Sequence, residues 1–334
     1  MLKGKQTWIF NSKPVIISSA AVGGPFEAKG AIPNDFDILY EDLSMNQDSF
    51  EKAEKVLLEQ ACERAISKAN MKKEDVNFLI SGDLMNQIIT STFAARTLGM
   101  PFLGIFGACS SSMEGLALAS LLIDSKAAEY VVAAASSHNI TVEKQFRYPT
   151  EYGAQKPPTA QWTVTGAGAG LIAQKGDGPR VTSATIGRIV DMGLCDPYNM
   201  GGAMAPAAVD TIEAHFRELN LKPSYYDLIA TGDLGRVGHT IAKDLLEKHG
   251  LKIPKEIFTD CGLLIYNKDQ LKVMAGGSGS GCSAVVTYGH LLNRMKRGEL
   301  KKILIIATGA LLSPLSYQQK ESIPCIAHAV SIEI

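Results

Sequence analysis

The sequence predicts an α/β protein built from two similar halves, with two buried helices at its centre. Two stretches, 72–84 and 222–234, align without a gap at an offset of 150 residues, and each reads as a linker, an apolar strand and Gly-Asp-Leu. Two further segments, 110–123 and 283–292, are apolar on nearly every face, which is typical of helices buried all round. Alternating strands and helices of this kind indicate a layered α/β fold.

The composition is that of an ordinary globular protein. The 334 residues are enough for two lobes with separate cores, and a formal net charge of −1 gives no indication of a nucleic-acid partner. The six cysteines are scattered, without a Cys-x-x-Cys pair or a cleavable signal, so we expect reduced thiols in a non-secreted chain and no zinc site. No apolar run reaches the roughly 18 residues that span a bilayer, so we expect any membrane attachment to be peripheral.

Each repeated strand follows an amphipathic helix. In the first half Asp48 and Glu51 are placed like a capping box at the start of that helix. Later, residues 119–136 and 288–309 both read as a helix, a polar turn and an apolar strand. We therefore expect an N-terminal half at 1–175 and a C-terminal half at 176–334. The apolar residues at helical spacing are Phe50, Ala53, Leu57, Ala61 and Ala65 in the first half, and Ala208, Ile212, Phe216 and Leu219 in the second.

Cys109 occupies a turn, GIFGACSSSMEG (104–115), between an apolar run and the start of a buried helix. Unpaired N–H groups and the helix dipole favour negative charge at such a place, and so favour a thiolate. A cysteine alone in an apolar turn is, however, more often a small packing residue. The chemistry of Cys109 therefore depends on its partners.

Several motifs resemble the thiolase and ketoacyl-synthase superfamily over nearly the whole chain. They are the Gly-Ala-Cys-Ser turn, the glycine-rich stretch 163–170, the turn at 275–284 and the closing strand 325–334. The resemblance implies a thiolase-like five-layer α-β-α-β-α fold. It also implies a homodimer that pairs through an edge strand near residues 102–106.

The resemblance also shows which catalytic partners are missing. The superfamily's synthases place a His after the second-half strand and an Asn on the second glycine-rich turn. Here Gly232 and Asp233 follow the strand, and the turn reads Gly-Ser-Gly at 277–279. Asp233 would disfavour a thiolate if it points into the pocket. Cys325 lies near the second thiolase cysteine, but without its glycine triplet. We therefore predict no catalytic residues, with acyl transfer by Cys109 as an alternative.

At a closer level, residues 4–27, 158–170 and the GACSSSMEG turn resemble a family of sporulation proteins from spore-forming bacteria. This resemblance implies that the ligand is dipicolinic acid, a flat pyridine with two carboxylates, taken into the developing spore with or without calcium. It implies a peripheral location at the spore inner membrane, with other membrane proteins of the same sporulation operon as partners. A structural subunit of a membrane transport complex remains a further alternative.

The turns that open the two central helices are the expected binding site. Hydroxyl groups beside exposed N–H groups favour carboxylates, and a His at the end of a strand is able to donate to one. Asp83 and Asp233 follow the repeated strands, where capping the next helix is the competing role. Lys144 and Arg147 lie in a following loop that is able to attract a dianion. We expect no cofactor and no bound metal of the protein's own. The predicted ligand-binding residues are Cys109, Ser110, His138, Thr163, Thr165, Asp233, Ser278 and Ser280.

Overall fold

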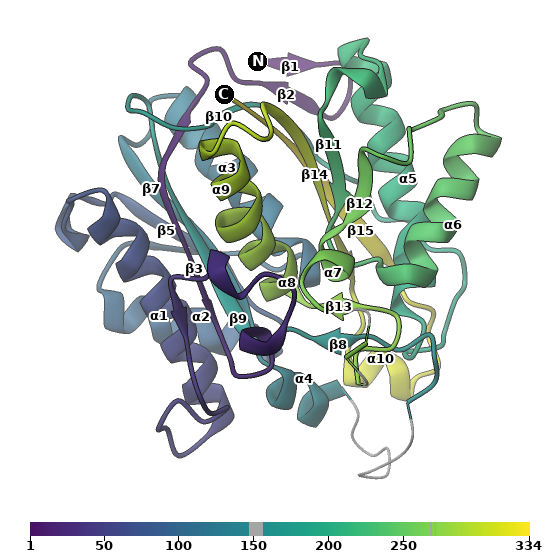
Figure 1. Cartoon of the computed structure of the whole chain (residues 1–334), viewed down its shortest axis with the longest axis horizontal. Helices are drawn as coiled ribbons and strands as arrows, with labels where there is room; N and C mark the ends of the chain where they lie inside the picture. Colours follow the sequence, from purple (N-terminus) through teal and green to yellow (C-terminus); the bar gives the residue numbers. More distant parts are fainter. Residues whose placement is uncertain (147–155, 268, 271) are drawn as a thin grey trace.

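Five layers of alternating helices and sheets form the molecule in the computed structural model (Figure 1). The structure describes residues 1–146, 156–267, 269–270 and 272–334. Two sheets enclose a pair of central helices, and further helices cover the outer face of each sheet (Figure 1). The predicted five-layer α/β fold is confirmed.

The two sheets have the same strand order and the same pattern of directions. In each, the first three strands pair antiparallel and the last two continue in parallel. The sheets meet where β10 pairs with β3 at a single register position, Arg180 opposite Val15. The first sheet runs β3 (Val15–Gly23), β9 (Gly166–Ala173), β7 (Tyr130–Ser137), β5 (Phe78–Gly82) and β6 (Phe102–Gly104), and the second runs β10 (Arg180–Thr185), β15 (Cys325–Glu333), β14 (Lys302–Ala310), β11 (Leu228–Thr231) and β12 (Phe258–Asp260).

The helices fill the other three layers. The outer helices are α1 (Phe50–Lys68) and α2 (Ile89–Leu98) on the first sheet, and α5 (Met200–Leu219) and α6 (Gly235–Lys248) on the second. The central layer holds α3 (Ser111–Asp124) and a continuous helical segment made of α8 (Ser280–Val285), a π-helical turn (Val286–Leu291) and α9 (Leu292–Lys296).

Shorter elements complete the chain. They are β1 (Leu2–Lys3), β2 (Thr7–Ile9), β4 (Ile38–Leu39), β8 (Trp162–Thr163), β13 (Gly277–Ser278), α4 (Asn139–Phe146), α7 (Cys261–Leu264), α10 (Pro314–Gln318), and single 3₁₀ turns that include Glu27–Lys29, Pro33–Asp35, Lys73–Asp75, Asn86–Ile88, Ala108–Ser110 and Pro223–Tyr225.

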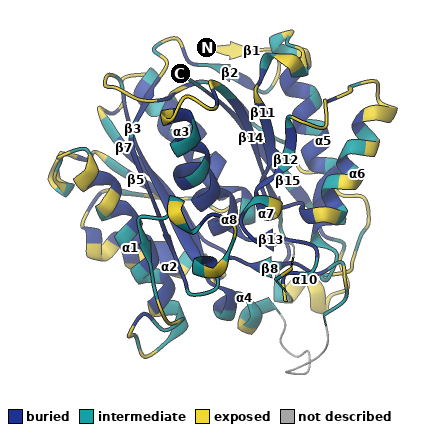
Figure 2. Cartoon of the chain, in the orientation of Figure 1, coloured by how far each residue is buried: buried dark blue, intermediate teal, exposed yellow. Residues whose placement is uncertain are grey.

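Apolar side chains join the layers. One buried cluster lies between the sheets and the central helices, and two others lie beneath α1–α2 and beneath α5–α6. Figure 2 shows α3 and α8 mostly buried, as their all-round apolar pattern predicts. Burying one large side chain, such as the fully buried Leu57 of α1, contributes about 2 kcal/mol to stability.

The glycine-rich stretch of β9 allows close packing of a central helix. A Cβ atom at Gly168 would lie 2.5 Å from the carbonyl carbon of Ala284, and one at Gly170 would lie 2.5 Å from the Tyr288 ring. Both distances are shorter than real Cβ contacts, so only glycine lets α8 and the π-helical turn rest directly on the strand.

The N-terminus of α1 corrects one expectation from the sequence. The N-cap is Ser49, whose hydroxyl accepts from the backbone N–H of Lys52 at 3.3 Å. Asp48, the predicted cap, instead bonds the ammonium group of Lys52. Aspartate and serine are about equally good caps. The sequence alone therefore does not decide which of the two neighbouring residues is the N-cap.

The predicted boundary at 175/176 falls in the turn between β9 and β10. The N-terminal residues, however, lie against the second half: β2 pairs antiparallel with β10, and the backbone N–H groups of Lys5 and Gln6 donate to Glu218 on α5. Across the described part of the chain, the search for a helix of sufficient length and hydropathy to cross a bilayer finds none.

Candidate functional site

Cys109 lies in a tight turn directly before the central helix α3. Ala108 adopts a left-handed conformation, with φ of 48°. The Ser110 hydroxyl donates to the carbonyl of Gly107 at 2.6 Å, and the N–H of Gly107 donates to the Ser111 hydroxyl at 3.1 Å. The first serines of the turn therefore hold its backbone together.

Strand β14 presses against this turn. A Cβ atom at Gly309 would lie 2.1 Å from the carbonyl oxygen of Gly107. Any side chain at 309 would therefore push the turn away, and with it Cys109. The second-half sheet thus positions the first-half cysteine.

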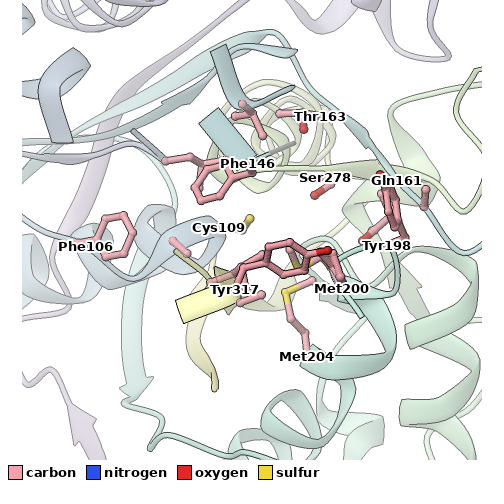
Figure 3. Close-up of a pocket in the computed structure, with 17 residues that line it drawn as sticks. Phe106, Cys109, Phe146, Gln161, Thr163, Tyr198, Met200, Met204, Ser278 and Tyr317 are labelled. Atoms are coloured by element: carbon pink, nitrogen blue, oxygen red, sulfur yellow. The ribbon is translucent and has the colours of Figure 1, made fainter. Parts of the chain in front are cut away.

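A cavity of about 290 Å³ opens beside Cys109 (Figure 3). Aromatic and aliphatic side chains make up most of its wall, and none of its described lining residues carries a charged side chain. The apolar lining residues are Leu84, Phe106, Ala108, Val142, Phe146, Ala160, Pro197, Met200, Met204, Ala310 and Leu312, and the polar ones are Cys109, Gln161, Thr163, Tyr198, Ser278 and Tyr317.

The carboxyl group of Asp233 lies against the thiol of Cys109, beneath the cavity. Asp233 is fully buried. One of its oxygens accepts from the Thr308 hydroxyl at 2.7 Å, and the other accepts from the N–H of Gly279 at 3.0 Å and the Ser278 hydroxyl at 3.3 Å. The aspartate that the sequence places after β11 therefore does point at the cysteine.

This arrangement keeps Cys109 protonated. Burial raises the pKa of the thiol well above its usual range, and the adjacent Asp233 raises it further. The N–H of Gly279 and the hydroxyl of Ser278 act in the opposite direction without cancelling the rise. A thiol with a raised pKa is a poor nucleophile at neutral pH.

The chain's six histidines are all described, and none of them lines the cavity. His239 of α6 packs against the Phe258 ring, at 4.4 Å between ring centroids. His215 bonds Thr185 and Tyr226, and His328 accepts from Gly187. Cys109 therefore has no imidazole partner.

Three helix N-termini meet at the cavity. The 3₁₀ turn that contains Cys109 leads into α3, and Ser278 precedes the helical segment that starts at Ser280. The third is α5, whose first residue Met200 lines the wall and whose N-cap Asn199 accepts from the N–H of Gly202. The positive ends of the helix dipoles favour an anion here without a cationic side chain.

The structure brings four of the predicted ligand residues together. Cys109, Thr163 and Ser278 line the cavity, and Asp233 lies beneath them. Thr163 belongs to β8 and Ser278 to β13, which pair in parallel beside the cavity.

The other four predicted residues do not line the cavity, because their side chains serve the local backbone. Ser110 bonds Gly107, and the Ser280 hydroxyl donates to the carbonyl of Ser136. The Thr165 hydroxyl accepts from the N–H of Asn139 at 3.0 Å. Buried His138 bonds the carbonyl of Leu43 through Nε2 and the N–H of Ile140 through Nδ1.

The alternative capping role holds for one of the two repeated aspartates. Asp83 accepts from the N–H groups of Met85 and Ser91, and so caps the first turn of α2. The corresponding helix of the second half is α6. Its first turn is capped by Asp260, which accepts from the N–H groups of Leu234 and Gly235. Asp233 is thereby left to face Cys109.

Two cations of a loop were predicted to attract a dianion, but Lys144 lies on helix α4, where it pairs with Glu51 at 2.8 Å. Arg147 lies outside the described residues.

Sequence reasoning missed most of the cavity wall. Phe106, Phe146, Tyr198 and Tyr317 come from four separate segments, and Figure 3 shows them around the cysteine. One local signal was present: Asn199 followed by a helical stretch is a capping pattern. It marks the start of α5, although not its position beside Cys109.

Comparisons with known proteins identify relatives along the whole chain. A model of the family described as stage V sporulation protein AD matches residues 4–333. The stage V sporulation protein AD of Bacillus subtilis (strain 168) is 51% identical over 332 residues, covering 99% of this chain and 98% of that protein. The resemblance to sporulation proteins is confirmed.

Solved structures of condensing enzymes share the fold. The 3-oxoacyl-[acyl-carrier-protein] synthase III of Aquifex aeolicus VF5 superposes with a TM-score of 0.57 at 15% identity, covering 96% of this chain and 100% of that one. The cerulenin-bound OleA of Xanthomonas campestris gives a TM-score of 0.63 at 15% identity, covering 98% of each chain. At this identity the likeness concerns the fold alone, and the thiolase-like expectation is confirmed.

Proposed function

The chain belongs to the stage V sporulation protein AD family, and on that premise we propose that it is a non-catalytic protein that binds dipicolinic acid for uptake into the developing spore. Its role in sporulation follows from the family. The observation that carries the ligand assignment is the cavity beside Cys109, which combines aromatic walls with three helix N-termini.

The walls suit a flat aromatic ring. Phe106, Phe146, Tyr198 and Tyr317 surround a volume of about 290 Å³, at the lower end of the range typical of small-ligand pockets. Aromatic pairs in offset or edge-on contact contribute about 1 kcal/mol beyond the area they bury. A pyridine ring therefore gains from both burial and ring contacts.

The helix starts suit the carboxylates. The N-termini of α3 and α5 each favour a nearby anion by about 0.3–1 kcal/mol. The hydroxyl of Thr163 lies on the cavity wall as a donor, beside the Ser278 hydroxyl that bonds Asp233. A dicarboxylate is able to use these donors and dipoles, whereas an acyl chain has no charge for them to stabilise.

The absence of catalysis rests on Asp233. A condensing cysteine needs a group that takes its proton, and Asp233 instead raises the pKa of the thiol. Acyl transfer by Cys109 is the second candidate, because the cavity is largely apolar and ends at the thiol. A structural subunit with an empty cavity is the third.

In this proposal the protein is a homodimer bound to the surface of the spore inner membrane. Its partners are other membrane proteins of the same operon. Strand β6 lies at the free edge of the first sheet. Leu103 on that strand is 46% exposed, and Phe106 just after it is 50% exposed. An apolar edge strand is a natural place for a second copy to extend the sheet.

The test of ligand binding is the thermal stability of the protein with dipicolinate, measured with and without calcium. A ligand that binds only the folded state at 100 times its Kd stabilises by about 2.7 kcal/mol, so the melting temperature rises by several degrees. Ala310→Phe fills the cavity and should remove the rise. Its control, Ala127→Phe, adds the same ring at an exposed turn beyond the far end of α3 and should keep it.

The outcomes of this experiment and of an assembly assay separate the proposed binder from the structural subunit. No rise with millimolar dipicolinate contradicts the proposed ligand. A rise that survives in Ala310→Phe places the ligand elsewhere on the protein. Stable assembly with partner proteins in the absence of any small-acid binding favours the structural subunit.

A further inference from the structure

Two buried carboxyl groups lie close enough to interact electrostatically, and one of them, Asp233, contacts Cys109. Asp260 ends β12, and Asp233 follows β11, the neighbouring parallel strand. Both are fully buried. Asp260 accepts from the N–H of Leu234, the residue directly after Asp233, so the two carboxyl groups share one turn of backbone.

We propose that the Asp233–Asp260 pair takes up a proton when an anionic ligand enters the cavity, so that the anion is bound together with a proton. This inference rests on the proposed function, because it requires a ligand with negative charge. It adds a property that the binding of a carboxylate does not by itself imply, namely a fixed proton stoichiometry.

The hydrogen bonds around the pair favour the ionised form, but three of them come from hydroxyl groups that are able to reverse their direction. Asp260 accepts from the Thr231 hydroxyl at 2.6 Å, the N–H of Leu234 at 2.8 Å and the N–H of Gly235 at 3.0 Å. Asp233 accepts from Thr308, Ser278 and Gly279. Hydroxyl groups such as those of Thr231 and Thr308 are able to rotate and accept a hydrogen bond from the carboxyl O–H when the carboxyl group gains a proton.

No cation neutralises the pair among the described residues that surround it. Cys261 at the start of α7, Cys282 on α8 and Cys109 face it as thiols, and burial raises the pKa of each. On α6, burial lowers the pKa of His239 to about 4, so this ring is neutral, and exposed Arg236 bonds the carbonyl of Met274. Two adjacent buried charges without a counter-ion are costly, so one proton is readily held.

The Asp233–Asp260 pair gains or loses a proton near neutral pH. Burial raises the pKa of Asp260 to about 7, and the neighbouring Asp233 contributes to the rise. Burial also raises the pKa of Asp233. A carboxylate bound beside Cys109 adds a third negative charge above Asp233 and favours the protonated pair further.

The experiment is calorimetric titration of the full chain with dipicolinate at pH 7.5, in two buffers with different ionisation enthalpies. The difference in apparent binding enthalpy gives the number of protons taken up, and we expect a value between one half and one per ligand. The Kd should rise by up to about tenfold per pH unit above the titration of the pair, in a range where both ligand carboxyl groups are already ionised. Asp260→Asn should remove most of the proton uptake while the ligand still binds.

Asp233→Asn removes the other carboxyl group of the pair and repeats the test. Asp244→Asn, on the exposed face of α6, is the control and should leave the number of protons taken up per ligand unchanged. Binding without proton uptake overturns the inference and leaves the proposed function standing. Uptake that persists in both pair variants overturns the assignment to Asp233 and Asp260. No binding at any pH overturns the proposed function and this inference with it.

Discussion

Glu27 is a single buried carboxyl group at the contact between the two halves. Its Oε1 accepts from the Tyr266 hydroxyl of the second half and from the N–H of Thr165, while Oε2 is buried without a hydrogen-bond partner among the described residues. Burial raises its pKa to about 7, against 4.5 for an exposed glutamate. The folded protein therefore holds a proton on Glu27 that the unfolded chain releases.

The sign of the resulting pH dependence follows from this proton. Between about pH 4.5 and pH 7 the folded state binds more protons at Glu27 than the unfolded state, so this residue lowers stability as the pH rises through that window. Glu27→Gln keeps both bonds to Oε1 and carries no charge. We expect its stability advantage over the wild type to grow by about 2 kcal/mol between pH 5.5 and pH 8.

Urea unfolding at several pH values measures this difference. Glu247→Gln, at an exposed position of α6, is the matched control and should show no such trend. A constant difference between Glu27→Gln and the wild type across the range would mean that Glu27 does not titrate on unfolding.

Cys109 gives the second prediction at this scale. The wild-type thiol should react slowly with iodoacetamide at pH 8 and should form no acyl adduct with acyl-CoA, as measured by intact mass. Asp233→Asn removes the adjacent charge and so lowers the pKa of the thiol, and alkylation should accelerate about tenfold. The exposed Cys195 is an internal reference. An acyl adduct at Cys109 in the wild type would favour the acyl-transfer alternative.

At the scale of elements, the edge strand β6 carries the prediction of a dimer. Exposed apolar residues flank it: Ile89 and Phe93 on α2 are 41% and 38% exposed, and Leu103 lies on the strand itself. Leu103→Lys should convert a dimer into a monomer, because a charge on an edge strand opposes pairing. Light scattering after gel filtration measures the mass. Leu315→Lys, at a 63% exposed leucine of α10, is the control, and a dimer that persists in Leu103→Lys would place the interface elsewhere.

Most helices and strands were predictable because each is specified by a pattern of apolar residues within its own segment of the sequence. The repeated strands at 78–82 and 228–231 and the buried central helices appear in the sequence as periodic or continuous apolar runs. The two capping errors, Asp48 for Ser49 and Asp233 for Asp260, share one cause. Several acceptor residues compete near each helix start, and tertiary packing decides which one faces the N–H groups.

At the scale of the whole molecule, the site was only partly predictable. Cys109, Thr163, Ser278 and Asp233 were found because each lies on a motif or a repeat. The aromatic wall was not, because residues such as Tyr198 and Tyr317 reach the cavity from segments more than one hundred positions apart. Their role depends on how loops cross the carboxyl ends of two sheets, which no local pattern encodes.

The pairing of β2 with β10 has a consequence for how the protein is made. Residues 7–9 leave the ribosome well before their partner residues 183–185. At roughly 5–20 residues per second, this N-terminal ribbon waits on the order of ten seconds or more for its strand. The other side of β10 is then paired with β15, which lies still further along the chain. Strands β2 and β15 therefore pair with opposite sides of one strand, and the second sheet is completed only after residues 325–333 have been synthesised.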